Sequence, residues 1–494
     1  MNLNNTFPVL LFLLVEMVLP IGCKRVTNDV HEAGREPVIE PDYKGVTIPQ
    51  NIAPLNFMIN EEGASFTIEA ISESGTRLSV KSSNGKVRFP ENSWKKLLKS
   101  NQEARMEIFI TSKNKDKSLT KFNPFYLNVA KEQIDPYLCY RLLYPGYERY
   151  FQIKIVQRCI ENFKESSLIE NQLVGNNCTN CHSFSRNNPE KFLIHIRGSI
   201  GGTYFINRNK ISRTDLKTKE MTSGAVYPSW HPGGKYVTFS SNSIVQEFYS
   251  IPGKDIEVTD LASSLILYDT EKNEISPVKE DDTTRYMETF PEWSPDGKYL
   301  YYCRTKQVTD STGYQNIKYN LVRKPFDEPS KSFGKTEVVF NASEINKSVS
   351  FPRISPDGQY LVFTLHNYGN FSIWHKEADL YILNLQNGKA DRMSVNSDES
   401  ESYHSWSSNG KWLVFSSKRG DGLTARPYFA YFGSKAQFGK PFVLPQKDPT
   451  LYERMLKTYN KPEFVMGKIN LSSRDFERAA KNKAVKAIWA GQKK

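Results

Sequence analysis

A turn between two strand-like segments recurs four times in the second half of the sequence, and this repeat constrains the fold more than any other feature. The copies are YPSWHPGGKYVTFSS (227–241), FPEWSPDGKYLYYCR (290–304), FPRISPDGQYLVFTL (351–365) and YHSWSSNGKWLVFSS (403–417). Ser-Pro-Asp-Gly and its variants supply turn chemistry, because Pro presets φ, Asp or Asn bonds its own backbone, and Gly accepts a positive φ. Apolar and polar residues alternate after each turn, as in a half-buried strand. The repeat therefore predicts strand–turn–strand units.

The spacing of the copies indicates how these units are combined. Equivalent residues in successive copies lie 63, 61 and 52 residues apart, and further strand-like runs such as SLILYDT and DLYILNL lie between them. Several strands per unit at this period are typical of β-propeller blades. Upstream, KFLIHIRG and GTYFINRNKISRTDL could complete an earlier blade, and downstream, RPYFAYFG and KPFVLP could close the ring. We predict a propeller of five blades, or six, over residues 190–447.

The rest of the chain divides into four segments. Residues 1–23 have the character of an export leader, and residues 46–130 contain short strand-like runs between Gly, Asn and Ser turns, as in a β-sandwich. Residues 131–189 have mixed periodicity and are predicted to form a partly helical connector. Residues 448–494 are predicted to form a basic helical tail. The predicted fold class is mostly β, which suits a chain with 26 Tyr and 29 Phe.

The tail supplies most of the net charge of +12, since residues 454–494 hold 11 Lys or Arg against 3 acidic residues. Its helix is expected to begin with a capping box of Ser472 and Asp475. One face would carry Phe476, Ala480, Ile488 and Trp489. The helix could dock on the body with a solvated basic side, or contact anionic lipid or an acidic partner. No nucleic-acid partner is expected, because the basic residues are not interleaved with stacking aromatics in a known module.

The leader predicts export. Residues 7–22 are apolar apart from Glu16 and precede Cys23. This pattern resembles a bacterial lipoprotein signal in which Cys23 is lipidated, although an ordinary cleaved secretory leader is the alternative. We expect a bacterial envelope protein, anchored through Cys23 at the outer membrane and facing the periplasm or the surface. In that oxidising compartment Cys139 and Cys159 could form a disulfide or remain two buried thiols, while Cys303 is expected to be buried in a strand.

The segment NNCTNCHSF contains the C-x-x-C-H spacing of covalent haem attachment, in Cys178, Cys181 and His182. Two thiols would bond one edge of a haem c and His182 would be the proximal ligand of its iron. His231 and His195 are the candidate distal ligands, with Met221 a further one. The alternatives are a Cys178–Cys181 disulfide, with His182 incidental, and a zinc knuckle that lacks a fourth ligand.

Other polar residues of the repeats are candidates for lining the central channel of the propeller. They are His375, His404, Arg353, Arg419 and Arg426.

The repeats resemble the TolB-type propeller repeat, whose hallmark is the W-S-P-D-G-K turn. The chain as a whole resembles a family of exported TolB-like propeller lipoproteins with an N-terminal β-domain and a CHSF cysteine motif. The resemblance runs through IPQNIAPLNF, IDPYLCYRLLYPGYE, NCTNCHSF, WHPGGKY, FSIWHKEADLY, SYHSWSSNGKW, SSKRGDG and KPFVLPQKDP. Members are often labelled as related to cytochrome c or its biogenesis, so the resemblance implies the fold together with a link to haem.

These observations lead to two functional hypotheses. The first is a lipid-anchored envelope protein that carries a covalent haem c and transfers electrons, with the propeller as the docking body for an envelope protein partner. The second is a haem-free propeller that acts as a protein- or glycan-binding scaffold. A hydrolase is not expected, because the sequence has no G-x-S-x-G elbow and too few residues follow the repeats to form an α/β-hydrolase domain.

Overall fold

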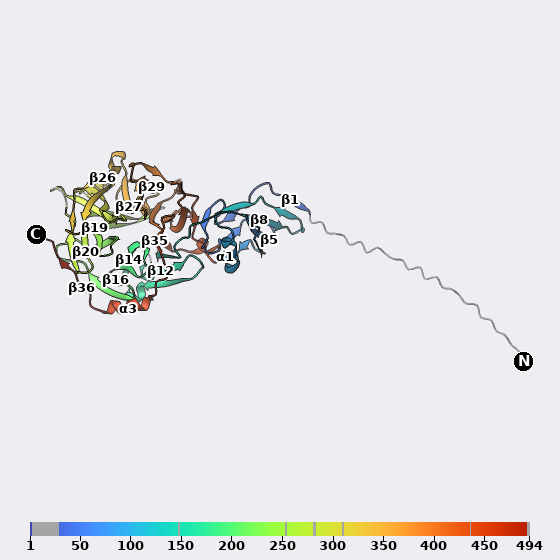
Figure 1. Ribbon diagram of the computed structural model, residues 1–494, viewed down its shortest axis with the longest axis horizontal. Helices are drawn as coiled ribbons and strands as arrows, with labels where there is room; N and C mark the ends of the chain where they lie inside the picture. Colours follow the sequence, from blue (N-terminus) through green and yellow to red (C-terminus); the bar gives the residue numbers. More distant parts are fainter. Residues whose placement is uncertain are drawn as a thin grey trace.

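The computed structural model describes Met1 and residues 29–146, 149–251, 254–279, 283–308, 311–434 and 436–491. The predicted lipidation site Cys23 lies outside these residues. Within them, the helices are all too short or too polar to cross a membrane. The described chain is mostly β, as predicted, and forms a small N-terminal domain beside a larger body of radiating sheets (Figure 1).

The N-terminal domain consists of a seven-stranded sheet, a three-stranded sheet and one helix. β5 alternates strictly between half-buried and buried residues, as expected for a strand with one face on a core. The elements are β1 (Val30–Glu32), β2 (Ile39–Glu40), β3 (Thr47–Pro49), β4 (Phe57–Ile59), β5 (Ser65–Ser72), β6 (Arg77–Ser82), β7 (Lys86–Val87), α1 (Glu91–Lys99), β8 (Arg105–Lys113), β9 (Leu119–Lys121) and β10 (Phe125–Ala130). Two sheets packed on a shared core match the predicted β-sandwich-like domain, which begins earlier than residue 46.

Six further sheets form the body, and we number these blades by sequence from the cysteine motif. The first blade contains β14 (Cys178–Phe184), β15 (Lys191–Arg197), β16 (Gly202–Asn207), β17 (Lys210–Asp215) and β36 (Val485–Lys486). The second contains β18 (Ala225–Trp230), β19 (Tyr236–Ile251), β20 (Lys254–Asp269), β21 (Glu274–Pro277) and β37 (Ile488–Trp489). The third contains β22 (Tyr286–Trp293), β23 (Tyr299–Lys306), β24 (Asn320–Asp327), β25 (Ser332–Phe333) and β26 (Glu337–Phe340).

The remaining three sheets complete the circle. The fourth blade contains β27 (Ser348–Ile354), β28 (Tyr360–His366), β29 (Asp379–Asn384) and β30 (Ala390–Arg392). The fifth contains β31 (Glu401–Trp406), β32 (Trp412–Ser417), β33 (Arg426–Tyr431) and β34 (Phe442–Val443). The sixth joins β35 (Thr458–Val465) to β11 (Tyr137–Leu143), β12 (Lys154–Cys159) and β13 (Glu165–Glu170).

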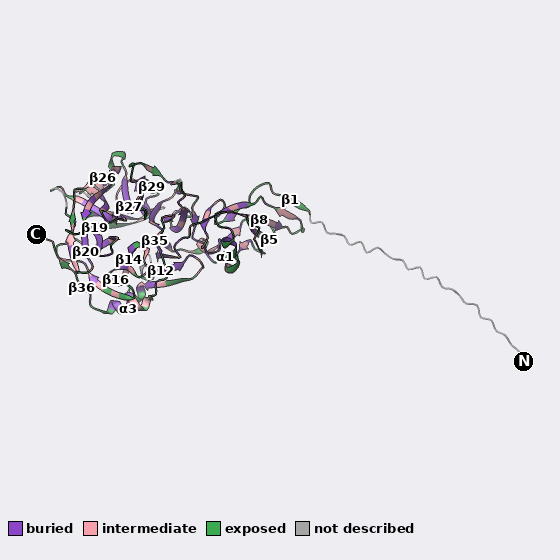
Figure 2. Ribbon diagram, in the orientation of Figure 1, coloured by how far each residue is buried: buried purple, intermediate pink, exposed green. Residues whose placement is uncertain are grey.

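The inner strands of the six sheets form a closed ring. β14, β18, β22, β27, β31 and β35 each contact the next one, and β35 contacts β14. Apolar side chains fill the space between neighbouring sheets; Leu193 of the first blade and Val237 of the second belong to one such core. The purple, buried residues of Figure 2 accordingly concentrate within the sheets of the body. The arrangement is a β-propeller with six blades, the larger of the two predicted numbers.

Residues 131–189, predicted as a partly helical connector, contain more strand than helix, and the helical parts described are three short 3₁₀ helices, Tyr150–Gln152, Asn171–Val174 and Ser185–Asn187. This segment supplies three strands of the sixth blade and the inner strand of the first. β11 is buried along almost its whole length because it lies between β12 and β35. A strand buried on both faces has a continuous apolar run, and such a run has no period that distinguishes it from a buried helix.

Ring closure also differs from the prediction. RPYFAYFG and KPFVLP contain β33 and β34 of the fifth blade, and the ring closes where β35, from the predicted tail, pairs antiparallel with β11. The two partners lie at opposite ends of the body's sequence, so no local pattern could reveal their pairing.

The tail is only partly helical. α2 (Leu451–Arg454) and α3 (Ser473–Lys481) are its helices, and the predicted capping box of Ser472 and Asp475 opens α3. Phe476 and Ala480 are buried in the core between the sixth and first blades. Ile488 and Trp489 are not on this helix but in β37; this strand and β36 add parallel edges to the second and first blades.

Candidate functional site

The six inner strands share a four-residue motif. It is CHSF (181–184), YPSW (227–230), FPEW (290–293), FPRI (351–354), YHSW (403–406) and KPEF (461–464). A register shift interrupts the pairing at the first two motif positions of five strands; in β14 the pairing resumes one residue earlier, at His182. The first motif residue has a positive φ in Tyr227, Phe290, Phe351, Tyr403 and Lys461, between 48° and 53°. The motif is therefore a β-bulge repeated around the ring.

The bulge turns two motif positions toward two cavities of the central channel. The third residues, Ser183, Ser229, Glu292, Arg353, Ser405 and Glu463, line a cavity of 530 Å³, which we call the wide mouth. The first residues Tyr227, Phe290, Phe351, Tyr403 and Lys461 line a cavity of 90 Å³, which we call the narrow chamber. Arg353 lines both.

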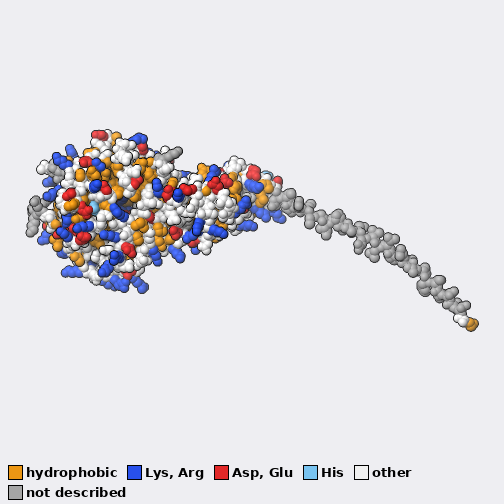
Figure 3. All heavy atoms as spheres, in the orientation of Figure 1, with side chains coloured by type: hydrophobic (Ala, Val, Ile, Leu, Met, Phe, Trp, Pro, Cys, Tyr) orange, Lys and Arg blue, Asp and Glu red, His pale blue; other side chains and the backbone are white. Residues whose placement is uncertain are grey.

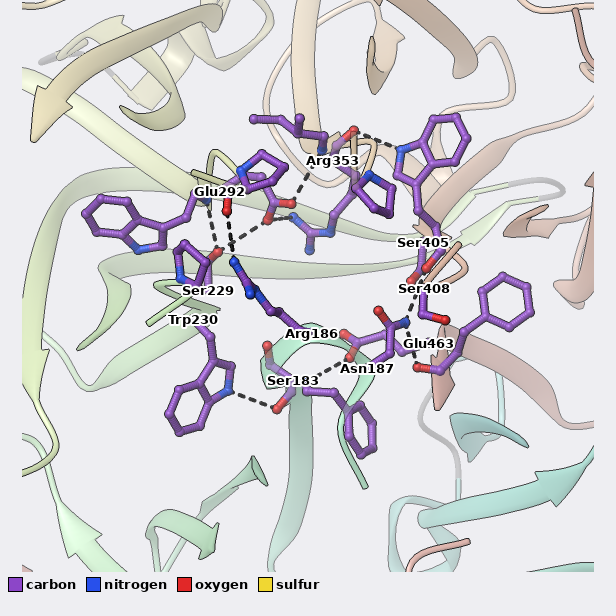
Figure 4. A pocket seen from close by; sticks show the side chains of 18 of the residues that line it. Ser183, Arg186, Asn187, Ser229, Trp230, Glu292, Arg353, Ser405, Ser408 and Glu463 are labelled. Carbon is purple, nitrogen blue, oxygen red and sulfur yellow. Dashed lines mark hydrogen bonds and ion pairs between the residues drawn. The ribbon is translucent and has the colours of Figure 1, made fainter. Parts of the chain in front are cut away.

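An ion pair lies in the wide mouth (Figure 4). Arg353 Nη1 donates to Glu292 Oε2 at 3.2 Å, and the Ser229 hydroxyl donates to the same oxygen at 3.3 Å. Burial raises the pKa of Glu292 above its usual value, although Arg353 opposes this shift. The pair thus presents both signs of charge at the centre of the ring.

A second carboxylate lies across the ring. Glu463 Oε1 is 3.1 Å from Lys461 Nζ, and Glu463 Oε2 accepts the backbone N–H of Phe184 at 3.2 Å. Burial favours the neutral acid, but the charge of Lys461 prevails and the pKa of Glu463 is lowered. Arg186 crosses the mouth and donates to the carbonyl oxygen of Pro295 at 3.0 Å.

The tryptophans of the motif join neighbouring blades. Trp230, Trp293 and Trp406 are only 8%, 4% and 5% exposed. Their indole N–H groups donate to the Ser183 carbonyl (3.1 Å), the Thr238 hydroxyl (3.0 Å) and the Arg353 carbonyl (3.2 Å). Their ring faces are therefore packed rather than offered to a ligand.

The predicted haem site does not have the geometry that a haem needs. His182 is fully buried, neither of its ring nitrogens has a hydrogen-bond partner among the described residues, and burial lowers its pKa to about 4. Cys178 is a free, half-buried thiol in a β-strand, and the side chain of Cys181 is not described. A haem requires open space beside the proximal imidazole. Neither channel cavity is lined by Cys178 or His182, so the arrangement does not fit the group.

The candidate distal ligands are each held within the blades. His195 Nδ1 lies 3.1 Å from the Thr203 hydroxyl, and burial lowers its pKa to about 3. His231 Nε2 lies 3.3 Å from the Gly297 carbonyl, with its ring against Trp293. Met221 is buried in the core between the first two blades.

Of the five residues predicted to line the channel, only Arg353 lines either cavity. Arg419 pairs with Glu401 at 3.1 Å, and Arg426 donates to backbone carbonyls of the tail. His375 pairs with Glu377 at 3.2 Å, and His404 Nε2 lies 2.8 Å from the Val362 carbonyl. Arg419 and His375 make these contacts near their own blades, whereas His404 connects the fifth blade to the fourth and Arg426 connects the fifth blade to the tail.

Cys139, Cys159 and Cys303 are buried in strands of the body. Cys139 and Cys159 are both free and buried, so the alternative of a disulfide between them is wrong. Cys303 is a buried free thiol in β23, as predicted.

Only part of the site is predictable from sequence patterns. Glu292 and Glu463 were not singled out, although FPEW belongs to a recognised repeat. An alignment of only the four residues that precede each Ser-Pro-Asp-Gly-like turn identifies KPEF and CHSF as further copies of the motif. The different turn after CHSF, SRNNPEK, hid its relation to the other copies.

Comparisons with known proteins agree with this architecture. The family model described as the N-terminal β-propeller domain of prolyl oligopeptidase matches residues 202–424. No curated protein matches the chain. Among solved structures, TolB from Acinetobacter baumannii is similar at 13% identity and a TM-score of 0.41, over 72% of this chain and 79% of that one. A hypothetical selenium-binding protein from Sulfolobus tokodaii is similar at 10% identity and a TM-score of 0.40, over 69% and 96% of the two chains. The region that the family model matches lies within the six-bladed propeller described above.

Proposed function

We propose that this protein is a binding scaffold of the bacterial envelope, whose wide mouth holds a segment of a partner protein. The observation that carries the proposal is the convergence of the third motif residue of every blade on one cavity of 530 Å³. Concave sites with a few convergent polar groups are the usual places of ligand binding. Here those groups come from all six blades, so the complete ring is required to form the site.

The lining favours a peptide over a glycan. Sugar rings stack on exposed aromatic faces, but the three tryptophans of the mouth are buried and bonded between blades. The mouth instead offers serine hydroxyls, the amide of Asn187 and charges of both signs. Such groups suit the backbone amides and charged side chains of an extended segment.

The location in the envelope rests on the leader. The apolar run before Cys23 supports export and lipid attachment at that residue. Metabolic labelling with a fatty acid, compared between the natural protein and Cys23→Ala, tests the anchor, and equal labelling of both would contradict it.

Photo-crosslinking in the native envelope tests the binding site. Met466 lies at the wide mouth and is 47% exposed, so a photoreactive amino acid there faces the bound segment. Val338, on the outer strand β26, is 65% exposed and provides a matched control. We expect one protease-sensitive crosslinked product from position 466 and none of that size from position 338.

Two results would contradict the proposal. The same products from both positions would indicate random collisions, and a crosslinked product that resists proteases but is removed by glycosidases would identify a glycan ligand. Glu292→Gln should weaken the crosslink, since it removes the carboxylate that pairs with Arg353 in the mouth.

The other hypothesis, a haem-bearing electron-transfer protein, is supported by the C-x-x-C-H spacing of Cys178, Cys181 and His182. It needs the first blade to open around His182, because that imidazole is fully enclosed in the closed ring.

A further inference from the structure

We infer that the narrow chamber is a second binding site, which takes the carboxylate group of a small organic acid with an apolar body. The chamber lies at the other end of the central channel from the wide mouth. Its lining combines cations, aromatic rings and amides, and each of these features contributes to the inference.

The described charged residues that line the narrow chamber are all positively charged. Among the described residues, its lining includes Arg141, Arg197, Arg353 and Lys461 and no Asp or Glu. Glu292 and Glu463 pair with Arg353 and Lys461 from the side of the wide mouth. All the charged residues of the described lining are therefore cations, and this favours an anion in the chamber.

Two of the cations are held in defined positions. Arg141 is 7% exposed and donates from Nη1 to Asn180 Oδ1 at 2.6 Å. Lys461 Nζ donates to the His182 carbonyl at 2.6 Å in addition to its pairing with Glu463. Because these side chains are already ordered, an anion can bind them with little further loss of conformational entropy.

Aromatic rings form one wall of the chamber. The ring centroids of Tyr227 and Phe290 are 4.5 Å apart, those of Phe290 and Phe351 are 4.0 Å apart, and those of Phe351 and Tyr403 are 4.8 Å apart. This wall belongs to four successive blades and follows from the positive φ of the first motif residue. Phe290, Phe351 and Tyr403 are as buried as the tryptophans of the mouth, so they give the chamber an apolar wall rather than open faces for stacking. Such a wall suits a small apolar group and disfavours a strongly hydrated, doubly charged anion.

The long β19–β20 hairpin covers the chamber. Ile244, Gln246 and Val258 of this hairpin line it. Lys254 Nζ donates to the Tyr368 hydroxyl at 3.1 Å, and that hydroxyl donates to Glu257 Oε2 at 3.1 Å, which fastens the hairpin to the fourth blade. Arg197 and Gln246 are exposed, so a small ligand has a route from solvent past these two side chains.

The size and chemistry together define the ligand class. The cavity of 90 Å³ is far smaller than the wide mouth and holds one small group. A guanidinium group matches a carboxylate in planar, two-pronged hydrogen bonding. A carboxylate on a small apolar body would satisfy both the cations and the ring wall.

Calorimetric titration of the full chain with benzoate tests the inference. We expect saturable binding of benzoate, with benzylammonium and inorganic phosphate binding at least about tenfold more weakly, the equivalent of one charge-assisted hydrogen bond. Arg197→Gln should weaken benzoate by about the same factor, and Gln246→Glu should abolish binding because it adds a like charge to the lining. Lys210→Gln, on exposed β17 of the same blade as Arg197, should leave the affinity unchanged.

Two further arms identify the natural source of the carboxylate. A peptide with a C-terminal Phe and a free carboxylate would compete with benzoate if the chamber accepts chain ends, whereas the same peptide as an amide would not. Benzoate binding without such competition would restrict the site to free small acids.

The inference would be overturned by the absence of benzoate binding, by equal binding of benzylammonium, or by unchanged affinity in both Arg197→Gln and Gln246→Glu. Neither of these residues lines the wide mouth, so the result is independent of whether that mouth binds a peptide. Both side chains are exposed, and far-ultraviolet circular dichroism will confirm that the variants are folded.

Discussion

His182 and His404 occupy the same motif position but differ in their bonding. His182 is fully buried with no partner for either ring nitrogen among the described residues, whereas His404 is 3% exposed and its Nε2 lies 2.8 Å from the Val362 carbonyl. In the other four inner strands this position is Pro. A side chain without polar atoms is therefore compatible with the position, which makes the two histidines a matched pair.

We expect His182→Leu to change the melting temperature less than His404→Leu does, since the ring nitrogens of His182 make no hydrogen bond of good geometry among the described residues, although the backbone of Cys139 lies near them. His404→Leu should destabilise the protein by about 1 kcal/mol, because it removes a buried hydrogen bond. Thermal unfolding of both variants measures the difference. A larger loss in His182→Leu than in His404→Leu would reveal a ligand or partner of His182 that the closed ring does not contain.

At the level of single residues, the sequence reveals the C-x-x-C-H motif but not that it lies in a buried inner strand of the propeller. The spacing of Cys178, Cys181 and His182 agrees with haem attachment. The same three residues also lie in β14, an inner strand that carries the repeated bulge. Spacing describes separation along the chain and says nothing of burial, so it could not show that His182 is enclosed. The prediction for Arg353 was confirmed because its motif, FPRI, lies in a copy with a clear turn.

The β19–β20 hairpin is the element that departs most from a regular blade. Its residue Asp260 is buried and accepts hydrogen bonds from Asn242 Nδ2 (3.0 Å), the Tyr319 hydroxyl (2.8 Å) and Asn370 Nδ2 (2.6 Å). These donors come from the hairpin itself, the third blade and the fourth blade. Burial raises the pKa of Asp260 from 3.8 to about 6 despite these bonds.

Because the folded protein holds the proton of Asp260 more tightly than the unfolded chain, this group makes the free energy of unfolding fall as pH rises from 3.8 to about 6. The full effect is on the order of 2 to 3 kcal/mol. Asp260→Asn should remove this part of the pH dependence. Urea unfolding of both proteins across this range tests the expectation, and identical slopes in the two proteins would contradict it.

At the element scale, strands with a local pattern were predictable and those without one were not. β23 and β28 follow Ser-Pro-Asp-Gly turns and alternate in polarity, so their copies were recognised. β11 is a buried run whose neighbours are β12 and the distant β35, and its periodicity could not exclude a helix. α3 was predicted because a capping box is local, whereas β36 and β37 owe their conformation to the blade edges that they join.

Closure of the ring by β35 is the main structural requirement of the whole molecule. A chain that ends at Lys457 would lack β35, leaving β11 and β31 without their neighbour and both cavities without Lys461 and Glu463. We expect it not to unfold cooperatively. A chain that ends at Asn482 keeps β35 and α3 and should fold, with a modestly lower melting temperature because β17 and β21 lose their edge partners. Equal cooperativity of the two truncations would contradict this closure.

Burial of several neutral histidines gives the whole molecule a sensitivity to acid. The pKa is lowered by burial to about 4 in His182 and to about 3 in His195 and His404. The unfolded chain binds these protons more readily, so stability is present above the usual histidine pKa and is lost as pH falls below it. Each residue should contribute about 2 kcal/mol of loss between about pH 6.5 and pH 5. Urea midpoints that rise over that interval as pH falls would contradict the expectation.

For the whole molecule, composition indicates the mostly-β fold class, but charge and composition do not show which residues the closed ring brings together. On the face shown in Figure 3, Lys and Arg lie among Asp and Glu, so the net charge of +12 does not by itself mark a binding site there. The cation-rich chamber arises from four residues on three blades, Arg141, Arg197, Arg353 and Lys461, which only the closed ring brings together.

The C-x-x-C-H segment lies in the inner strand of the first blade, and we propose that the propeller binds a partner and carries no haem. Expression in a bacterial strain that attaches haem to such motifs, followed by intact-mass measurement and a pyridine haemochrome spectrum, tests it most directly. We predict a mass accounted for by the processed chain and its lipid alone, with no Soret band. A mass increased by one haem, with an absorption band that is lost in Cys178→Ser, would contradict the claim.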